Sequence, residues 1–205
     1  MEIVLCTRNQ EKTRIMAAHL KQAGHEIISL DDMEGDPPEI PREGSAFAEK
    51  ALAEALAVAK WSGFPALAES SGLMVNALGG EPGVRSATYA GGDRNIEANM
   101  AHLLAKMEKV PGNERQAHYV CVVCLASPDG RTWEAEGSAY GMITTQIKGP
   151  AGSDYEQVFF FPNAGMTFAE MPPLIKNRVS HLFHALNKLA RQLPGIEREL
   201  GAVED

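Results

Sequence analysis

The chain has 205 residues, with 27 Asp or Glu against 19 Lys or Arg, which gives a formal net charge of −8. Its apolar share of 44% suits a globular fold with a sizeable core, and no apolar run approaches the ~20 residues of a membrane span. The acidic balance argues against unspecific binding to nucleic acid, and three cysteines without framework spacing favour a reduced, cytoplasmic protein.

The first part of the chain predicts alternating strands and helices. Residues 3–6 form a short β-prone run, and apolar residues then recur at helical spacing from Ile15 to Ala23. The following elements, in chain order, are a strand over 25–30, a loop over 31–46, the clearest helix over 47–62, and a short strand over 65–68 that enters a turn at 69–72.

The rest of the chain is richer in strands. The expected elements are a strand over 73–77, a Gly/Pro turn over 79–83, a helix over 95–107, a hairpin of 117–126 and 131–139, a buried strand over 158–161, and one long helix from Val179 to Leu193. This order predicts an α/β or α+β fold with a central mixed sheet flanked by helices. We expect one domain over 1–193 and a polar C-terminal tail over 194–205.

The first candidate site runs from Thr7 to Lys12, where a strand passes through a polar turn into a helix. The free amides of a helix start favour anions, so Lys12 could neutralise a phosphate while Thr7 and Asn9 donate hydrogen bonds. In the alternative interpretation, Asn9 caps the helix and Lys12 is solvated.

The second candidate is Glu69-Ser70-Ser71-Gly72, a carboxylate at the end of a strand followed by two hydroxyls. Mg²⁺ prefers one or two carboxylates together with phosphate oxygens, so this segment could hold the ion if the fold brought Glu43 or Glu49 near it. Alone, the segment is equally well a plain turn.

Two further motifs are a cysteine pair at 121 and 124, which indicates a structural role, and a group of polar residues between 152 and 181, which indicates ligand binding. Cys121 and Cys124 lie three apart in an apolar β run and therefore on opposite faces of the sheet, which favours buried structural cysteines. A glycine loop over 152–156, followed by Lys176 and the Ser180-His181 pair, suits a polar ligand, although each part could also be a solvated loop or a cap. His181 and His184 have no acidic or cysteine partner at zinc spacing.

The order and spacing of these motifs resemble the house-cleaning pyrophosphatases, which hydrolyse inosine and xanthosine triphosphates to monophosphate and pyrophosphate. The resemblance covers residues 3–193, and it is carried by Thr7-x-Asn9-x-x-Lys12, Gly44-x-x-Phe47-x-Glu49, Gly79-Gly80-x-Pro82-Gly83-x-x-Ser86-Ala87-x-Tyr89, Arg115-x-Ala117, Gly149-Pro150-x-Gly152 and Lys176-x-x-x-Ser180-His181. It implies an elongated, two-lobed α/β fold, a nucleotide cleft between the lobes, and a homodimer.

The departures from the family pattern fall on its functional positions. Ser70 stands where the family has the Asp that acts as general base, and Glu69 replaces the Asp before it. The other departures are Arg8 for a glycine, Lys50 and Glu54 for the Asn and Lys of the long helix, Ser153 for the Phe that stacks on the purine, and Leu182 for the Arg that reads the base. A serine cannot take a proton from water at neutral pH without a base beside it.

The resemblance therefore implies a divergent pyrophosphatase that acts on purine nucleoside triphosphates with Mg²⁺ or Mn²⁺, and whose base choice can differ from that of the family. Lys12, Glu69 and Ser70 are its expected catalytic residues, and Glu43, Glu49 and Glu69 are its expected metal ligands. The expected substrate-binding residues are Thr7, Asn9, Lys12, Ser71, Ser153, Asp154, Tyr155, Glu156, Lys176, Ser180 and His181. Tyr155 is the nearby aromatic candidate for base stacking. The alternative is a nucleotide-binding or scaffold relative that has lost catalysis. Neither hypothesis includes a nucleic-acid or membrane partner.

Overall fold

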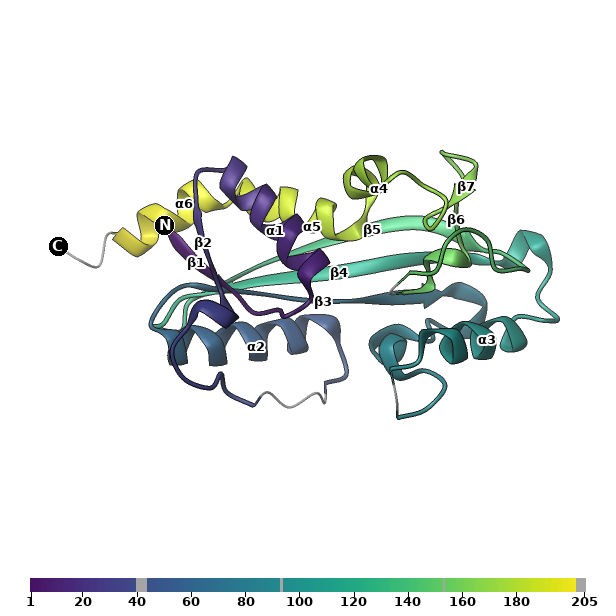
Figure 1. Cartoon of the computed structure of the whole chain (residues 1–205), viewed down its shortest axis with the longest axis horizontal. Helices are drawn as coiled ribbons and strands as arrows, with labels where there is room; N and C mark the ends of the chain where they lie inside the picture. The colour runs from purple at the N-terminus through teal and green to yellow at the C-terminus, as the bar shows by residue number, and fades with distance from the viewer. Residues whose placement is uncertain (40–43, 93, 153, 202–205) are drawn as a thin grey trace. The chain divides into compact units, whose positions relative to one another are not determined.

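The computed structural model describes residues 1–39, 44–92, 94–152 and 154–201 (Figure 1). Its chain forms two compact units. Unit 1 comprises Met1–Ser70, Cys121–Gly137 and the segment that starts at Leu182. Unit 2 comprises Ser71–Val120 and Ser138–His181. None of the described helices has the length and apolar character that a membrane span requires.

The described residues form a seven-stranded sheet in the order β2-β1-β3-β4-β5-β6-β7. Strand β1 is parallel to both β2 and β3, whereas β6 is antiparallel to β5 and β7, so the sheet is mixed and the predicted α/β class is confirmed. The strands are β1 (Glu2–Leu5), β2 (Glu26–Ser29), β3 (Ala66–Val75), β4 (Gln116–Ala126), β5 (Thr132–Ile143), β6 (Phe159–Phe161) and β7 (Met166–Thr167).

In unit 1, the strands bury both faces because their side chains alternate in direction. One face carries Leu5, Leu67 and Cys121 and packs against α1 (Gln10–Gln22), α5 (His181–Ala190) and α6 (Leu193–Gly201). The other face carries Cys6 and Cys124 and packs against α2 (Phe47–Ser62). Figure 1 shows α2 on the opposite side of the strands from α1. We call these the α1 face and the α2 face.

In unit 2, the core lies between α3 (Ile96–Lys106) and the aromatic residues of the sheet. Tyr119, Phe159 and Phe168 form edge and stacked ring contacts at 4.8 to 6.0 Å. The remaining helix of the described chain is α4 (Pro173–Val179), and short 3-10 turns connect the other elements.

Three predictions about elements are wrong. The turn expected at 69–72 is part of the continuous strand β3, because pairing in the sheet beside β4 overrides the turn preference of Ser and Gly. Residues 193–201 form α6 instead of a tail, since Leu193, Ile196 and Leu200 recur at helical spacing and pack against the α1-face core. The single helix expected from Val179 to Leu193 is divided among α4, α5 and α6.

Candidate functional site

The start of α1 is closed by its own cap. Asn9 Oδ1 accepts from the backbone N–H groups of Glu11 at 3.0 Å and Lys12 at 3.2 Å, and Thr7 Oγ1 accepts from the Asn9 amide at 3.2 Å. The predicted Asn9 cap is therefore confirmed. Two of the amides that could have bound an anion are occupied by this cap, so the side chain of Lys12 is the stronger feature of the segment.

Lys12 is not simply solvated, as the alternative interpretation held. Its Nζ lies 2.5 Å from Oε1 of Glu69, and the two side chains are 34% and 9% exposed. The second carboxylate oxygen of Glu69 lies 3.9 Å from the Sγ of Cys121. The acid is thus buried on the α1 face beside a thiol, while its lysine partner reaches the surface.

Glu54 is a third ionisable group near this pair, and it comes from α2. It is half-buried, and its pKa is raised to about 7, first by burial and then by the negative charge of Glu69, with Lys12 acting in the opposite direction. The charge of Glu54 also adds to the effect of burial in raising the pKa of Cys6 well above its usual value. Glu54 therefore lies near the end of β1, the middle of β3 and the start of α1. We call Lys12, Glu54 and Glu69 the acidic cluster.

The sequence contains a pattern that predicts Glu54 as a site residue. Among the family motifs, Glu54 stands out only because it replaces a lysine. Ala51, Ala55 and Val58 form the buried stripe of α2, and position 54 is three residues after the first and four before the last. An acid at that spacing faces the sheet rather than the solvent. Acidic side chains that face the protein interior are rare, so Glu54 at this position indicates a functional site.

Of the predicted metal ligands other than Glu69, Glu49 is bonded to the residues just before its own helix. The carboxylate of Glu49 accepts from the backbone and hydroxyl of Ser45 and from the Ala46 amide at 2.7 to 3.3 Å, so it caps α2, and these bonds lower its pKa. Glu43 lies outside the described residues. Among those residues, no group of three or more His, Cys, Asp or Glu side chains could hold a metal ion.

Unit 2 contains a second lysine–glutamate pair. Lys176 Nζ donates to both oxygens of Glu156, at 2.7 and 3.0 Å, and the side chains are 14% and 20% exposed. The pair joins α4 to the turn at Tyr155–Gln157, whose start is capped by Asp154 Oδ1 at 2.8 Å from the Tyr155 amide. Ser153 lies outside the described residues.

The structure does not support Tyr155 as a stacking ring for a base. The residue is 0% exposed, and its hydroxyl donates to the Ser86 carbonyl at 2.8 Å. Burial also raises the pKa of this hydroxyl, so the ring and its polar end both belong to the core of unit 2. The aromatic signal that predicted a ligand contact is a packing signal instead.

The remaining predicted residues lie within strands or at the ends of helices. Ser70 and Ser71 are half-buried in β3, and Ser180 ends α4. His181 begins α5 and stacks on Tyr119, with 4.7 Å between ring centroids and 10° between planes. Cys121 and Cys124 belong to the two different cores of unit 1, which confirms that they lie on opposite faces.

The chain matches the model of the Ham1 family over residues 3–192. It belongs to that family. It is 42% identical to the dITP/XTP pyrophosphatase of Desulforamulus reducens, covering 92% of this chain and 93% of that protein, and 44% identical to a dITP/XTP pyrophosphatase of Thermus thermophilus, covering 92% and 90%.

Solved structures agree with this assignment. A HAM1 protein from Coxiella burnetii superposes with a TM-score of 0.87 at 32% identity, covering 95% of this chain and 99% of that chain. The Staphylococcus aureus Ham1 protein has a TM-score of 0.85 at 33% identity, with coverage of 95% and 99%. The Ham1 fold therefore extends over nearly all of the chain, including the segments in which its polar residues depart from the family motifs.

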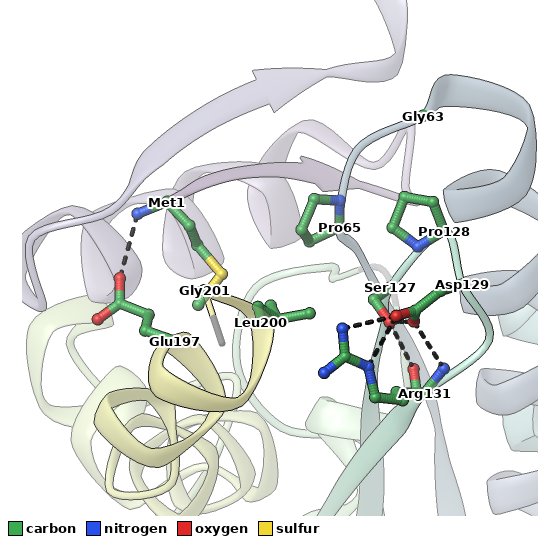
Figure 2. Close-up of a pocket in the computed structure, with 10 residues that line it drawn as sticks. All are labelled: Met1, Gly63, Pro65, Ser127, Pro128, Asp129, Arg131, Glu197, Leu200 and Gly201. Atoms are coloured by element: carbon green, nitrogen blue, oxygen red, sulfur yellow. Dashed lines mark hydrogen bonds and ion pairs between the residues drawn. The ribbon is translucent and has the colours of Figure 1, made fainter. Parts of the chain in front are cut away.

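Figure 2 shows a pocket of about 530 Å³ in unit 1 that contains none of the predicted site residues. It lies beside Met1 and Pro65, which precede the parallel strands β1 and β3, whereas the acidic cluster lies past the end of β1. Its charged groups bind one another, with Arg131 paired to Asp129 at 2.6 Å. In open parallel sheets, ligands bind outside the carboxyl ends of the strands, so the acidic cluster is the better candidate.

Proposed function

We propose that this chain hydrolyses purine nucleoside triphosphates to monophosphate and pyrophosphate, and that the acidic cluster of unit 1 is its reaction site. The family membership supports a nucleotide pyrophosphatase, because the similar proteins named above are dITP/XTP pyrophosphatases. The observation that carries the placement is the Lys12–Glu69 pair, in which the lysine side chain is 34% exposed and the glutamate side chain 9%.

In this proposal, Lys12 binds the phosphates, and Glu69 orients it. A buried carboxylate fixes the direction of the lysine side chain, which lowers the entropy lost when a triphosphate binds. The ammonium offers three donors, so it can bind a phosphate oxygen while it stays bonded to Glu69. Its positive charge then offsets the negative charge that builds on the phosphates during cleavage.

Magnesium or manganese enters the proposal as the ion that the triphosphate itself carries. Such an ion supplies further positive charge to the phosphates. The described residues contain no group of three or more His, Cys, Asp or Glu side chains that could hold it, and Glu69 is bound to Lys12 while Glu49 caps α2. No catalytic step is therefore assigned to the metal.

Base choice is expected to be broader than in relatives that retain the base-reading side chains. Tyr155 is buried in the core, and Leu182 is packed against the α1-face core of unit 1. Stacking on an aromatic ring contributes about 1–3 kcal/mol per base in nucleic-acid systems. Without it, phosphate contacts should dominate affinity, so inosine, xanthosine and common purine triphosphates should differ less in KM.

Release of pyrophosphate from these triphosphates, with Mg²⁺ or Mn²⁺, tests the proposal. Lys12→Ala should lower kcat/KM about 100-fold, the typical cost of removing one charge-stabilising group. Lys21→Ala is the matched control, because Lys21 is an exposed lysine in the last turn of the same helix. Equal activity of the Lys12→Ala and wild-type proteins would contradict the proposal.

A second candidate function is nucleotide binding without turnover, and the serine at position 70 favours it. No carboxylate of β3 replaces the missing acid on the side of the strand that Ser70 occupies. A nucleotide that binds the native chain raises its melting temperature whether or not it is hydrolysed. Thermal stabilisation by triphosphates without pyrophosphate release would therefore support this candidate over the first.

A further inference from the structure

The two sides of β3 show where an acid is missing in unit 1. Leu67 packs on the α1 face, whereas Ala66 and Ala68 pack on the α2 face. Since side chains alternate along a strand, Glu69 continues the α1 face and Ser70 continues the α2 face. The contact of Glu69 with Lys12 of α1 agrees with this assignment. The position that lacks its carboxylate therefore faces α2.

Glu54 approaches that position from α2. Its neighbour Ala55 is fully buried in the α2-face core. Cys6, whose pKa is raised first by burial and then by Glu54, belongs to the same core, and the Cys6 amide donates to the Leu67 carbonyl at 2.9 Å, three residues before Ser70 along β3. The same carboxylate also interacts with Lys12 and Glu69. The position of Glu54 between the buried residues Ala51, Ala55 and Val58 directs its side chain toward the sheet, on the face that Ser70 also occupies, and its charge acts on Lys12 and Glu69.

We infer that Glu54 is the group that activates the attacking water, and that α2 supplies the carboxylate that β3 lacks at Ser70. This inference rests on the proposed function. The resembled family has a lysine on the helix and an aspartate on the strand at these two positions. Here the helix carries the acid and the strand is neutral, so the acid has moved from one side of the interface to the other.

In the hydrolytic step, the water oxygen forms a bond to the α-phosphorus. The bond between that phosphorus and the α–β bridging oxygen breaks, with its electron pair leaving on pyrophosphate. The proton of the water passes to the carboxylate of Glu54 and then to solvent. The charged groups around this carboxylate are Lys12 of α1, Glu69 of β3 and the thiol of Cys6. A neighbouring negative charge increases the tendency of a carboxylate to take up a proton.

Turnover of four proteins tests this inference: the wild type, Glu54→Gln, Glu54→Gln with Ser70→Asp, and the control Glu97→Gln. Glu97 is an exposed acid in the first turn of α3. Glu54→Gln should lower kcat at least about 100-fold with KM changed less than about threefold, because a general base contributes roughly 10²–10⁴-fold to the chemical step. Ser70→Asp in the same chain should restore activity at least about tenfold, because it returns a carboxylate to the same interface. Glu97→Gln should match the wild type.

The outcomes distinguish the role of Glu54 from the function on which it depends. A wild type that releases no pyrophosphate overturns the proposed function, and the inference with it. An active wild type with an equally active Glu54→Gln overturns the role of Glu54 alone. Circular dichroism and the triphosphate-induced rise in melting temperature report on folding and binding. If Glu54→Gln loses both the activity and the thermal response, and Ser70→Asp restores neither, Glu54 supports the fold or the binding of substrate and is not the base.

Discussion

Two lysine–glutamate pairs occupy the two units of the chain, and they differ in which partner is accessible. In unit 1, Lys12 is 34% exposed and Glu69 is 9% exposed. In unit 2, the corresponding fractions are 14% for Lys176 and 20% for Glu156. A cation with an exposed end on a buried anchor can meet an anionic ligand, whereas a pair in which both partners are mostly covered is better suited to joining elements of the fold.

The surroundings of the pairs extend this contrast. The Lys12–Glu69 pair has a second carboxylate, Glu54, within electrostatic reach, so the acidic cluster holds two acids and one lysine. Lys176 instead donates to both oxygens of Glu156 and joins α4 to a turn whose first residue, Tyr155, is buried. We therefore propose that the same residue pair supports chemistry in unit 1 and structure in unit 2. Substitutions in each unit test this division.

The largest expected effect is on the stability of unit 2, where the buried Tyr155 precedes Glu156 of the Lys176–Glu156 pair. Tyr155→Ala should lower the free energy of unfolding by about 3–5 kcal/mol, the usual cost of removing a buried aromatic side chain. Tyr155→Phe removes only the hydroxyl that bonds the Ser86 carbonyl, and it should cost about 1 kcal/mol. Urea unfolding measures both. A Tyr155→Ala variant with wild-type stability but weaker nucleotide binding would reverse the assignment of this ring to the core.

The second effect is the pH dependence of stability that Glu54 gives to unit 1. The pKa of Glu54 is about 7 in the folded chain, above its ordinary value of 4.5, so folding favours its protonated form. The associated stability is fully present below pH 4.5 and is lost as pH rises to 7. Glu54→Gln should remove a decline on the order of 1–3 kcal/mol over that window, measured by urea unfolding at a series of pH values. An unchanged pH dependence would show that Glu54 is solvated.

The third effect is the coupling within the unit 2 pair. A double-mutant cycle with Lys176→Met and Glu156→Gln should give a coupling free energy of about 1–2 kcal/mol, because the pair is mostly covered and bonded at two points. Its value should change little with salt. A coupling near zero at moderate salt would place this pair on the surface and remove the difference between the two units.

The sequence predicted most of the framework because local patterns and tertiary packing agree there. The helix over 47–62 coincides with α2, and the hairpin strands predicted at 117–126 and 131–139 correspond to β4 and β5. The errors arose where packing decides against a local preference. Pairing within the sheet keeps β3 extended through Ser70 and Gly72. The apolar residues of α6 pack against the α1-face core, although Pro194 and Gly195 are poor helix formers.

The candidate site was predictable only in part. Lys12 and Glu69 were singled out from their motifs, and they are bonded in the structure. Glu54 was seen only as a departure, because its importance depends on which strand lies opposite α2, and this is a long-range property of the sheet. Glu49 was predicted as a metal ligand from its spacing, and in the structure its carboxylate accepts from the amides and hydroxyl that precede its own helix.

The smallest expected effect decides whether Glu49 belongs to the acidic cluster. Because its hydrogen bonds lower its pKa below 4.5, the stability that it adds is present above that pH and is lost as the pH falls. Glu49→Gln should therefore lower the melting temperature at neutral pH by a few degrees at most, and the difference should shrink in acid. As a cap, Glu49 has no contact with the reaction, so the concentration of Mg²⁺ that gives half-maximal pyrophosphate release should stay at the wild-type value. If Glu49→Gln raised that Mg²⁺ concentration several-fold without changing the melting temperature, Glu49 would be a metal ligand and would belong to the acidic cluster.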